Sequence, residues 1–211
     1  MDRTRNPANG LCCSVGLNPT LSALPGRSVS ADRPMITIRK TEPAEVDVLM
    51  DVFEQAKRIM RKSGNMRQWT GNYPSKEIIM ADIEKGNSYV CIDNTGEIIG
   101  TFAFIRGNDP TYTHIYEGQW ADDISPYGVI HRLAGTETGK GVAQACLQWC
   151  YKQIPNLRAD THRDNRILQH ILQKHGFQYC GIIFLANGDE RLAFQRTENF
   201  FFNSSTPVPV K

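Results

Sequence analysis

The segment VIHRLAGTETGKGVAQACLQWC, residues 129–150, constrains the fold more than any other part of the sequence. An apolar strand pattern ends near Gly135, a turn containing Gly139 and Gly141 follows, and apolar residues then recur with a helical period. Such a connection directs several backbone N–H groups at one point, where the positive end of the helix dipole also lies. Glycine lets an anion approach the backbone closely and Lys140 adds positive charge, so the turn predicts an anion-binding site.

Two common nucleotide-binding motifs do not fit this turn. A P-loop requires Ser or Thr after its Gly-Lys pair, whereas Gly141 and then Val142 follow Gly139 and Lys140. The dinucleotide pattern GxGxxG fails because Gln144 occupies its last position. On its own, the turn fits equally well a strand-to-helix connection that binds no ligand.

The composition limits the classes of protein to consider. The chain has 211 residues, 40% hydrophobic and 22% charged, which suffices for one domain with a sizeable core. A formal net charge of +2 and an isoelectric point near 8.2 argue against a nucleic-acid partner. No apolar run approaches the ~20 residues of a membrane span, and the polar start lacks the apolar region of a secretory signal. We therefore expect a soluble, cytoplasmic protein without a membrane partner.

The cysteines point to the same compartment. The six cysteines are too sparse for a disulfide framework and are expected to be reduced thiols. Cys146 and Cys150 share one helix face, but no CxxC motif or neighbouring histidine pair completes a metal site. We expect these thiols to be buried structural residues and predict no metal.

Apolar periodicity predicts the element order β α α β β β α β α β β. Thr41 is expected to cap the first helix, with Pro43 in its first turn, and Ser75 the second. The turn DNTG predicts a hairpin. The later elements are a strand over 127–134, a helix over 139–152, a strand over 156–161, a helix from about Asn165 and a closing hairpin over 177–196.

The two ends of the chain have a different composition. Residues 1–33 are rich in Gly, Pro, Ser and Asn without apolar periodicity, which predicts a disordered leader before a domain over 35–197. A mis-assigned start or a transit peptide are the alternatives. Residues 198–211 are expected to form a C-terminal tail.

In this element order, with the turn GKGVA and a helix ending in KHGF, residues 35–196 resemble the GCN5-related N-acetyltransferases (GNAT). The likeness is to a bacterial branch with segments like GNMRQW and SPYGVIHRLA, for which it implies no particular substrate. The family signature is Gln or Arg, two variable residues, Gly, one variable residue, and Gly or Ala. Residues 138–143 match it except at Thr138, the first position.

The resemblance implies an α/β (α+β) fold, with a mixed, mostly antiparallel sheet of about seven strands and helices on both faces. It also implies acetyl-CoA as cosubstrate, with backbone amides of the turn on its pyrophosphate. The cofactor-binding residues implied are Leu133, Ala134, Thr138, Gly139, Lys140, Gly141, Val142, Ala143 and Asn165.

A second family signature lies around the next helix. Asn165 and Gly176-Phe177 match it, but Leu172 stands where the family places a tyrosine that protonates the departing CoA thiolate. Tyr179, His175 and Cys180 lie near the end of that helix, but none of them occupies the tyrosine position. The resemblance therefore leaves the general acid unassigned.

Acetylation of an amine requires its neutral form, and an amine with a pKa of ~10.4 is neutral only about once in two thousand molecules at neutral pH. A base is therefore expected near the strand before the turn. His131 lies on that strand, and Glu117 in the preceding segment is the second candidate. Each fits equally well a structural role, His131 as a hydrogen-bonded core residue and Glu117 as a solvated surface charge.

The acceptor is expected to be the amine of a small molecule or an amino-acid-like molecule, acetylated by direct transfer and held by residues that the resemblance places near the acceptor. These are Gln68, Trp69, Tyr116 and Trp120, with Tyr112 adding aromatic surface. The same aromatic residues fit a role as the cap of the open end of the sheet. Two functions remain open, an acetyl-CoA-dependent N-acetyltransferase and a non-catalytic acyl-CoA-binding or regulatory module. A homodimer is compatible with either.

Overall fold

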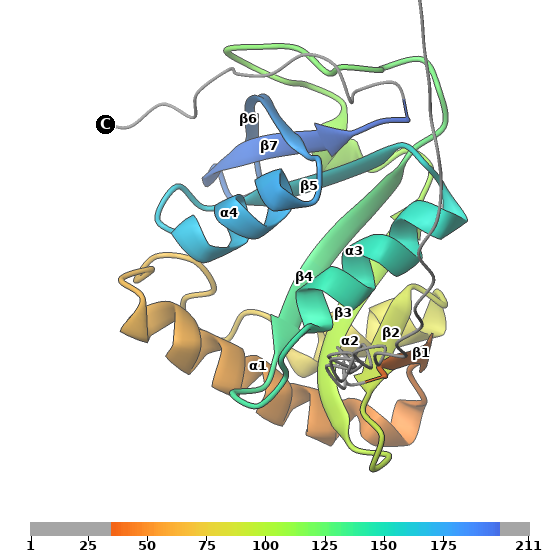
Figure 1. The fold of residues 1–211 in the computed structure, drawn as a ribbon. Coiled ribbons are helices and arrows are strands. Elements are labelled where there is room, and N and C mark those ends of the chain that lie inside the picture. The colour runs from red at the N-terminus through yellow and green to blue at the C-terminus, as the bar shows by residue number, and fades with distance from the viewer. Residues whose placement is uncertain (1–34, 199–211) are drawn as a thin grey trace, which may run out of the picture. The chain divides into compact units, whose positions relative to one another are not determined.

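The computed structural model describes residues 35–198; residues 1–34 and 199–211, and with them the predicted leader and nearly all of the predicted tail, lie outside the described part. The elements follow the predicted order (Figure 1). They are β1 (Thr37–Lys40), α1 (Val46–Lys62), α2 (Lys76–Glu84), β2 (Ser88–Ile92), β3 (Ile98–Arg106), β4 (Gly128–Gly135), α3 (Val142–Gln153), β5 (Leu157–Thr161), α4 (Arg166–Lys174), β6 (Gln178–Phe184) and β7 (Glu190–Arg196), with short 3-10 turns at Pro43–Glu45 and Pro110–Tyr112.

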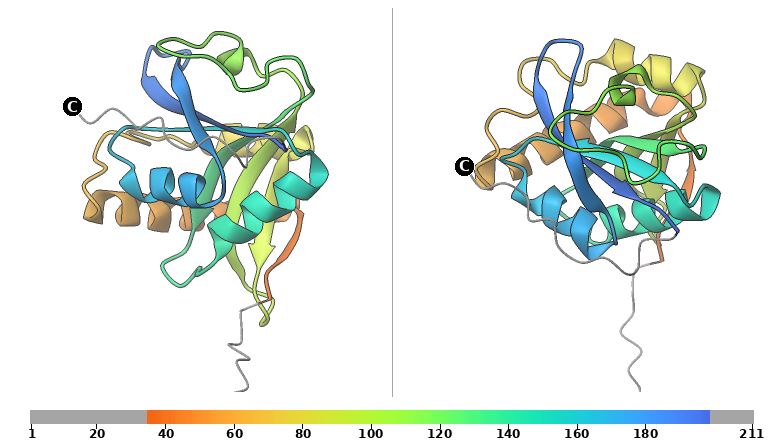
Figure 2. Two further views of the ribbon diagram at one scale, coloured as in Figure 1. Left: turned by 45° about the horizontal axis from the view of Figure 1, so that its top comes forward. Right: turned by 90° about the horizontal axis from the view of Figure 1, so that it is seen from above.

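The seven strands form one sheet in the order β1-β2-β3-β4-β5-β7-β6. Every neighbouring pair is antiparallel except β4 and β5, which are parallel. Helices α1 and α2 cover one face, and α3 and α4 cover the other (Figures 1 and 2). The expected mixed, mostly antiparallel sheet of about seven strands with helices on both faces is confirmed.

Alternation along the strands builds the two cores. On β2, Val90 packs with Leu49 and Phe53 of α1, while the flanking Tyr89 and Cys91 pack against α3 on the opposite face. This is the period-two pattern of a strand that is buried on both faces. Complete burial of one such side chain contributes about 1.5–3 kcal/mol.

Two helix starts differ from the prediction. The Thr41 hydroxyl does not cap the first helix; it lies 2.8 Å from the Ser88 hydroxyl, and the Glu45 carboxylate accepts the Glu42 N–H instead. Helix α3 begins at Val142, because the glycines before it form the turn. Ser75 caps α2 as expected, through the Ile78 N–H.

A long loop, residues 107–127, runs beside the β6–β7 hairpin (Figure 2). The loop is tied to β6 by a bridge between Tyr116 and Ile182. The buried guanidinium of Arg158 on β5 lies 4.1 Å from the Trp120 ring centroid and 3.8 Å from that of Tyr127. These two cation–π contacts hold the loop against β5.

Candidate active site

The site lies where β4 and β5 separate. The two parallel strands pair only from Gly128 with Leu157 to Ile130 with Ala159, and β4 then continues to Gly135 without a partner on that side. Figure 1 shows the strands diverging between α3 and α4. Beyond Ile130, the backbone of β4 therefore makes no ladder hydrogen bonds to β5.

A β-bulge shapes β4 at the same point. Ala134 pairs with Thr101 and His131 with Ala103, so Arg132 and Leu133 together face a single residue of β3. Arg132 takes a left-handed conformation, with φ +52°. Bulges free backbone polar groups from the ladder and redirect side chains, and they are frequent beside active sites.

The Arg132 guanidinium holds the bulge in place. Its Nε and Nη2 each donate to the Asp82 carboxylate of α2 at 2.8 Å, and Nη1 lies 3.3 Å from the Tyr73 hydroxyl. Burial lowers the pKa of Arg132, but Tyr73 and Asp82 outweigh it and raise the pKa overall, so the residue is a fixed cation.

The predicted anion turn has a defined geometry. Gly141, at φ +89°, is the N-cap of α3, and a Cβ on Gly139 would lie 2.5 Å from the Ile99 carbonyl oxygen. The N–H groups of Gly141, Ala143 and Gln144 donate to no backbone carbonyl of the described residues. These groups lie at the positive end of α3, and the Lys140 side chain is exposed, so the turn can accept a phosphate group.

A cavity of about 260 Å³ opens between this turn, α4 and α1. It is lined by most of the expected cofactor residues, namely Leu133, Ala134, Gly139, Val142, Ala143 and Asn165, together with apolar residues of α1 and α4. Thr138, Lys140 and Gly141 are not among the lining residues. The lining is mostly apolar, as a pantetheine arm would require.

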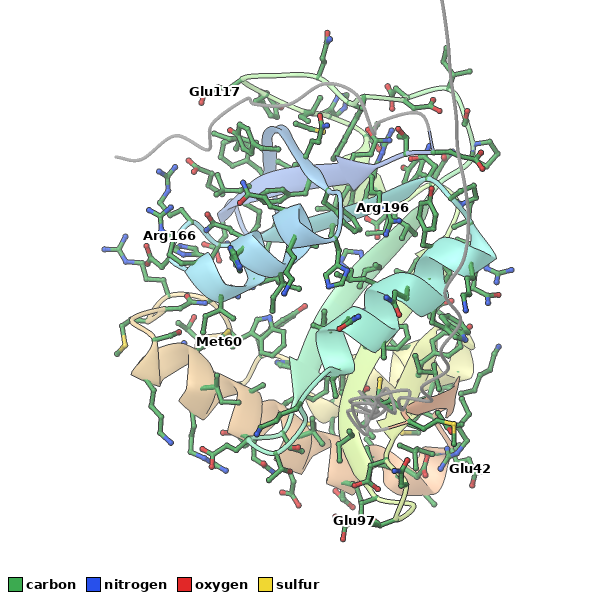
Figure 3. The ribbon with its side chains drawn as sticks, viewed as in Figure 1. Glu42, Met60, Glu97, Glu117, Arg166 and Arg196 are labelled. Atoms are coloured by element: carbon green, nitrogen blue, oxygen red, sulfur yellow. The ribbon has the colours of Figure 1, made fainter. Side chains whose placement is uncertain are left out.

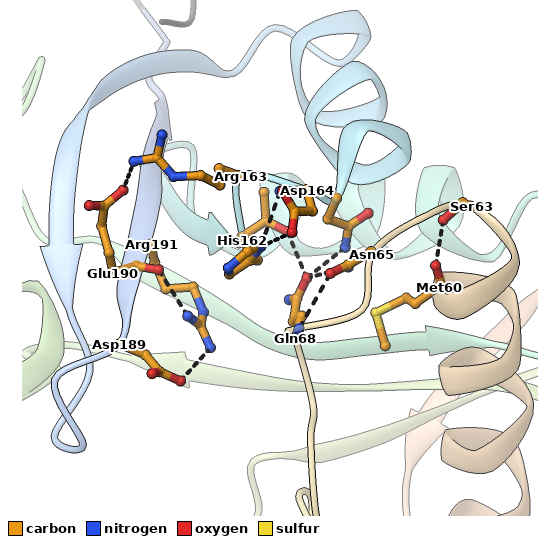
Figure 4. A network of polar contacts seen from close by, with 12 residues as sticks. Met60, Ser63, Asn65, Gln68, His162, Arg163, Asp164, Asp189, Glu190 and Arg191 are labelled. Carbon is orange, nitrogen blue, oxygen red and sulfur yellow. Dashed lines mark hydrogen bonds and ion pairs between the residues drawn. The ribbon is translucent and has the colours of Figure 1, made fainter. Parts of the chain in front are cut away.

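A hydrogen bond beside this cavity joins Asn165 to Gln68, which Figure 4 shows on the loop after α1. The Asn165 carbonyl caps α4 by accepting the Leu168 N–H, and its amide donates to the Gln68 side-chain oxygen at 2.9 Å. Asn65 donates to the same oxygen at 2.9 Å. Gln68 is buried, so it connects the α1–α2 loop to α4 while it also borders the site.

A second cavity, of about 430 Å³, lies toward the β6–β7 turn and the loop after β3. A smaller one of about 70 Å³ shares Trp69 and Leu133 with the first cavity and Trp69 and His131 with the second. We call the three the cofactor-side, acceptor-side and connecting cavities. Trp69, left-handed at φ +55°, lines all three.

His131 lines both the connecting and the acceptor-side cavity, and its Nε2 lies 2.8 Å from Oδ2 of Asp109. The two side chains are 15% and 9% exposed. Burial raises the pKa of Asp109, but the hydrogen bond and charge of His131 and the Thr111 N–H lower it overall. An ionised Asp109 favours the tautomer with hydrogen on Nε2, which leaves Nδ1 as a proton acceptor.

The other predicted site residues lie elsewhere. Glu117 is exposed on the 107–127 loop, and Figure 3 shows it at the outer edge, far from α1 and α3. Tyr116 packs against Phe184, and Trp120 is buried against Tyr112. None of these residues lines the three cavities.

The structure also locates the candidates for a general acid. Leu172 is 1% exposed and lines the connecting cavity, so this position of α4 offers the cavity no acidic group. Tyr179, His175 and Cys180 line none of the three cavities, and burial raises the pKa of Cys180 to about 11. The structure thus places no tyrosine at the α4 position of the site.

Three residues of the site were missed by the sequence analysis: Asp109, Arg132 and Arg191. The His131 partner of Asp109 lies 22 positions away and the Asp82 partner of Arg132 lies 50 positions away. Arg191 contacts its neighbours Asp189 and Glu190 and also approaches Asp160 of β5. No local pattern marks these three residues as part of a site. No sequence pattern predicts the left-handed conformation of Arg132, because the bulge follows from the register of β4 against β3.

Residues 35–198 contain no group of three His, Cys, Asp or Glu side chains that could hold a metal ion. Within the same residues, no helix has the length and apolar character needed to cross a membrane.

No protein-family model matches the chain, and no curated protein does either. Solved structures do match. A GNAT-family acetyltransferase from Streptococcus agalactiae is 37% identical with a TM-score of 0.71, over 78% of this chain and 96% of that one. A GNAT-family acetyltransferase from Listeria monocytogenes is 19% identical, with a TM-score of 0.57, over 76% and 94% of the two chains. A protein from Corynebacterium glutamicum described as histone acetyltransferase HPA2 and related acetyltransferase is 20% identical, with a TM-score of 0.52, over 77% and 96%.

Proposed function

Since this chain belongs to the GNAT family of acetyltransferases, we propose that it transfers the acetyl group of acetyl-CoA directly to the amine of a small molecule. One observation carries this proposal. The connecting cavity shares lining residues with both the cofactor-side and the acceptor-side cavity, and His131 lines the connecting and the acceptor-side cavity.

The residues of the cofactor-side cavity fit acetyl-CoA. The turn from Gly139 to Ala143 offers backbone N–H groups for the pyrophosphate, and the apolar wall between α1 and α4 suits the pantetheine arm. Thr138, in place of the family's Gln or Arg, contributes no charge, but the amides remain. The bound cosubstrate supplies a thioester whose carbonyl carbon accepts the amine and whose C–S bond breaks.

His131 and Asp109 supply the proton acceptor. Removing a proton from an amine of pKa ~10.4 at neutral pH costs about 4–5 kcal/mol, and a positioned base lowers this barrier. The Asp109 carboxylate orients the imidazole through Nε2, so Nδ1 takes the proton that the amine loses as the new C–N bond forms. Glu117, the other candidate, lines none of the cavities.

The bulge in β4 supplies polarity near the thioester. Because Arg132 and Leu133 lie outside the regular pairing, the Leu133 backbone at the wall of the connecting cavity can bind a carbonyl oxygen. Leu172 gives no proton to the thiolate, which is protonated by water in this proposal.

Acetyl transfer is tested by the release of free CoA with a panel of small primary amines, monitored with a thiol reagent, and by mass spectrometry of the product. Turnover that depends on the amine and gives an N-acetylated product supports the proposal. Binding of acetyl-CoA without transfer to any amine would contradict it.

Leu172, which puts no acidic group at the family's tyrosine position in the connecting cavity, favours a second candidate, a non-catalytic acyl-CoA-binding or regulatory module with the same fold. Such a protein would bind CoA at the α3 turn but would keep the thioester intact with every amine. The same assay distinguishes the two functions.

We also propose that residues 35–197 form the catalytic domain and that the protein is cytoplasmic. The cysteines support this compartment, because the thiols of Cys91, Cys146, Cys150 and Cys180 are free and buried.

A further inference from the structure

Arg191 on β7 is a buried cation at the acceptor end of the site. Only 6% of the residue is exposed, and it lines both the connecting and the acceptor-side cavity. Figure 4 shows its side chain between Asp189 and His162, on the strand that faces the loop of Gln68. A buried arginine normally has a close anionic partner, because the removal of its charge from water is costly.

The contacts of Arg191 leave much of its donor capacity unused. Its Nη1 donates to the Glu190 carbonyl at 2.9 Å, but Nη2 is 3.4 Å from the Asp189 carboxylate and Nε is 3.9 Å from that of Asp160. Close charge-assisted bonds measure about 2.7–2.9 Å. Asp160 has a nearer partner, because the Tyr112 hydroxyl donates to it at 2.5 Å.

Arg67 adds a second cation to the same cavity wall. It lines the acceptor-side cavity with Arg191, it is exposed, and it makes no hydrogen bond or ion pair with a described residue. The remaining charges of this wall are already paired, Arg132 with Asp82 and Asp109 with His131. Asp189 is half exposed and accepts from the Asn187 amide at 3.1 Å.

The neighbouring histidine is affected by this excess of positive charge. Burial is the largest cause that lowers the pKa of His162, and Arg191, Arg163 and Arg67 lower it further, against the opposing effect of Asp164. Arg163 is itself paired with Glu190. Arg67 and Arg191 are thus the cations of this region that lack a close carboxylate partner among the described residues.

The base and the cation border the same space. His131 and Arg191 both line the connecting cavity and the acceptor-side cavity. The acceptor-side cavity, with a volume of about 430 Å³, is large enough for a small molecule. We propose, on the basis of the acetyl transfer proposed above, that the acceptor is a small amino acid whose carboxylate binds Arg191 and Arg67 while its amine faces His131. A bidentate contact from Arg191 would fix the amine relative to the thioester.

Matched acceptors test this inference in the full-length protein. Each set contains an amino acid, its carboxamide and its decarboxylated amine, for example leucine, leucinamide and 3-methylbutylamine, with further sets built on β- and γ-amino acids. We expect kcat/KM to be roughly ten- to a hundredfold higher for the acid than for the decarboxylated amine in at least one set. The carboxamide should resemble the amine, because it lacks the negative charge.

Variants connect this preference to the two arginines. Arg67→Met and Arg191→Lys should each reduce the ratio of acid to amine, and the exposed Arg67 is free of any folding role that would obscure the result. Arg191→Met should remove the preference wherever the variant folds. Arg166→Met is the matched control, because Arg166 is exposed on α4, lines none of the cavities and points outward in Figure 3, so its ratio should equal that of the parent.

The outcomes separate this inference from the proposed function. Acetylation of neutral amines and acids at equal rates would overturn the inference and leave acetyl transfer standing. A stronger preference for aminoalkylphosphonates would overturn the carboxylate assignment. An unchanged ratio in both Arg67→Met and Arg191→Lys would also overturn it, and a protein that acetylates no amine at all would refute the proposed function and the inference together.

Discussion

The imidazole Nε2 of His131 lies 2.8 Å from the Asp109 carboxylate, although the residues are 22 positions apart. Asp109 starts a 3-10 turn and accepts the Thr111 N–H at 2.9 Å, so the carboxylate is fixed before it meets the imidazole. The Tyr112 ring packs edge-to-face on the imidazole, with centroids 5.6 Å apart. The imidazole is therefore fixed by the Asp109 carboxylate and by the Tyr112 ring. A histidine that acts as a base needs such a fixed orientation.

Replacement of the imidazole tests its role as the base. His131→Gln should reduce kcat by roughly a hundred- to ten-thousandfold and remove the pH dependence that a histidine base imposes, while the affinity for acetyl-CoA stays nearly constant. Steady-state kinetics across pH, with direct titration of acetyl-CoA, measures both effects. Glu117→Gln is the control and should have the turnover of the parent, because Glu117 lines no cavity. A His131→Gln enzyme with most of its turnover would exclude the assignment.

The Asp109 carboxylate should also contribute stability that depends on pH. Its pKa is lowered in the folded protein, from an ordinary value of 3.8, so the stabilisation is present above that value and is lost as pH falls through the folded pKa. Urea unfolding at pH 7, 4 and 3 measures the free energy of unfolding. Between pH 7 and pH 3, this free energy should fall less for Asp109→Asn than for the parent. Equal losses in the two proteins would show that Asp109 is not stabilised in its charged form.

The α3 turn should bind the pyrophosphate of CoA. Gly141→Asp places a negative charge at a left-handed position beside the free N–H groups, and we expect CoA binding to be abolished. Gly96→Asp is a matched control, because Gly96 has φ +90° in an open turn with no atom near its would-be Cβ. Both variants should lose about 1–3 kcal/mol from backbone strain, but only Gly141→Asp should lose CoA binding in a calorimetric titration. Tight CoA binding by a folded Gly141→Asp would refute the anion site.

The ion pair between Arg132 and Asp82 should stabilise the bulge. Its side chains are 12% and 11% exposed, so Asp82→Asn leaves a buried cation without its partner and should cost about 3–5 kcal/mol. The exposed pair of Lys76 with Asp47 connects α2 to α1, and Asp47→Asn should cost only about 0–1 kcal/mol. Equal changes in the free energy of unfolding for the two variants would contradict this view of the bulge.

The sequence also predicts that the leader is dispensable. Residues 1–33 lack apolar periodicity, so their deletion should leave the free energy of unfolding unchanged within error. Chemical denaturation of the deletion variant and the full chain measures this directly. A loss above about 2 kcal/mol would show that the segment packs on the domain.

The order of elements could be predicted because it depends on local periodicity. The alternation on β2 and the glycines at Gly139 and Gly141 are local signals, and they gave strands and a turn where the structure has them. Strand order is different. That β7 lies between β5 and β6 depends on pairing between distant segments, and the periodicity of a hairpin is the same whichever strand joins the sheet.

Only part of the site could be predicted from the sequence, for the same reason. His131 and the α3 turn lie on one continuous segment, so their neighbourhood could be expected from the sequence. Glu117 is close to them in sequence, but its loop turns toward β6 and carries the side chain to the surface. Asp109 lies at the start of the same loop, where a 3-10 turn follows it, and Arg191 lies on the last strand; both line the acceptor-side cavity.

The position of Trp69 makes the two halves of the site observable at once. Its indole borders the cofactor-side, connecting and acceptor-side cavities, whereas Trp120 and Trp149, the other tryptophans of the chain, line none of them. The ring rests on Phe53 of α1, with centroids 5.6 Å apart, and its backbone oxygen accepts from Arg61 at 3.0 Å. A ligand on either side therefore changes the surroundings of one fluorophore, whose position is fixed by these contacts with α1. The fluorescence emission of Trp69 should therefore change when either donor or acceptor binds. Titrations with each ligand alone and in sequence should show the order of binding, and whether the first ligand changes the affinity for the second.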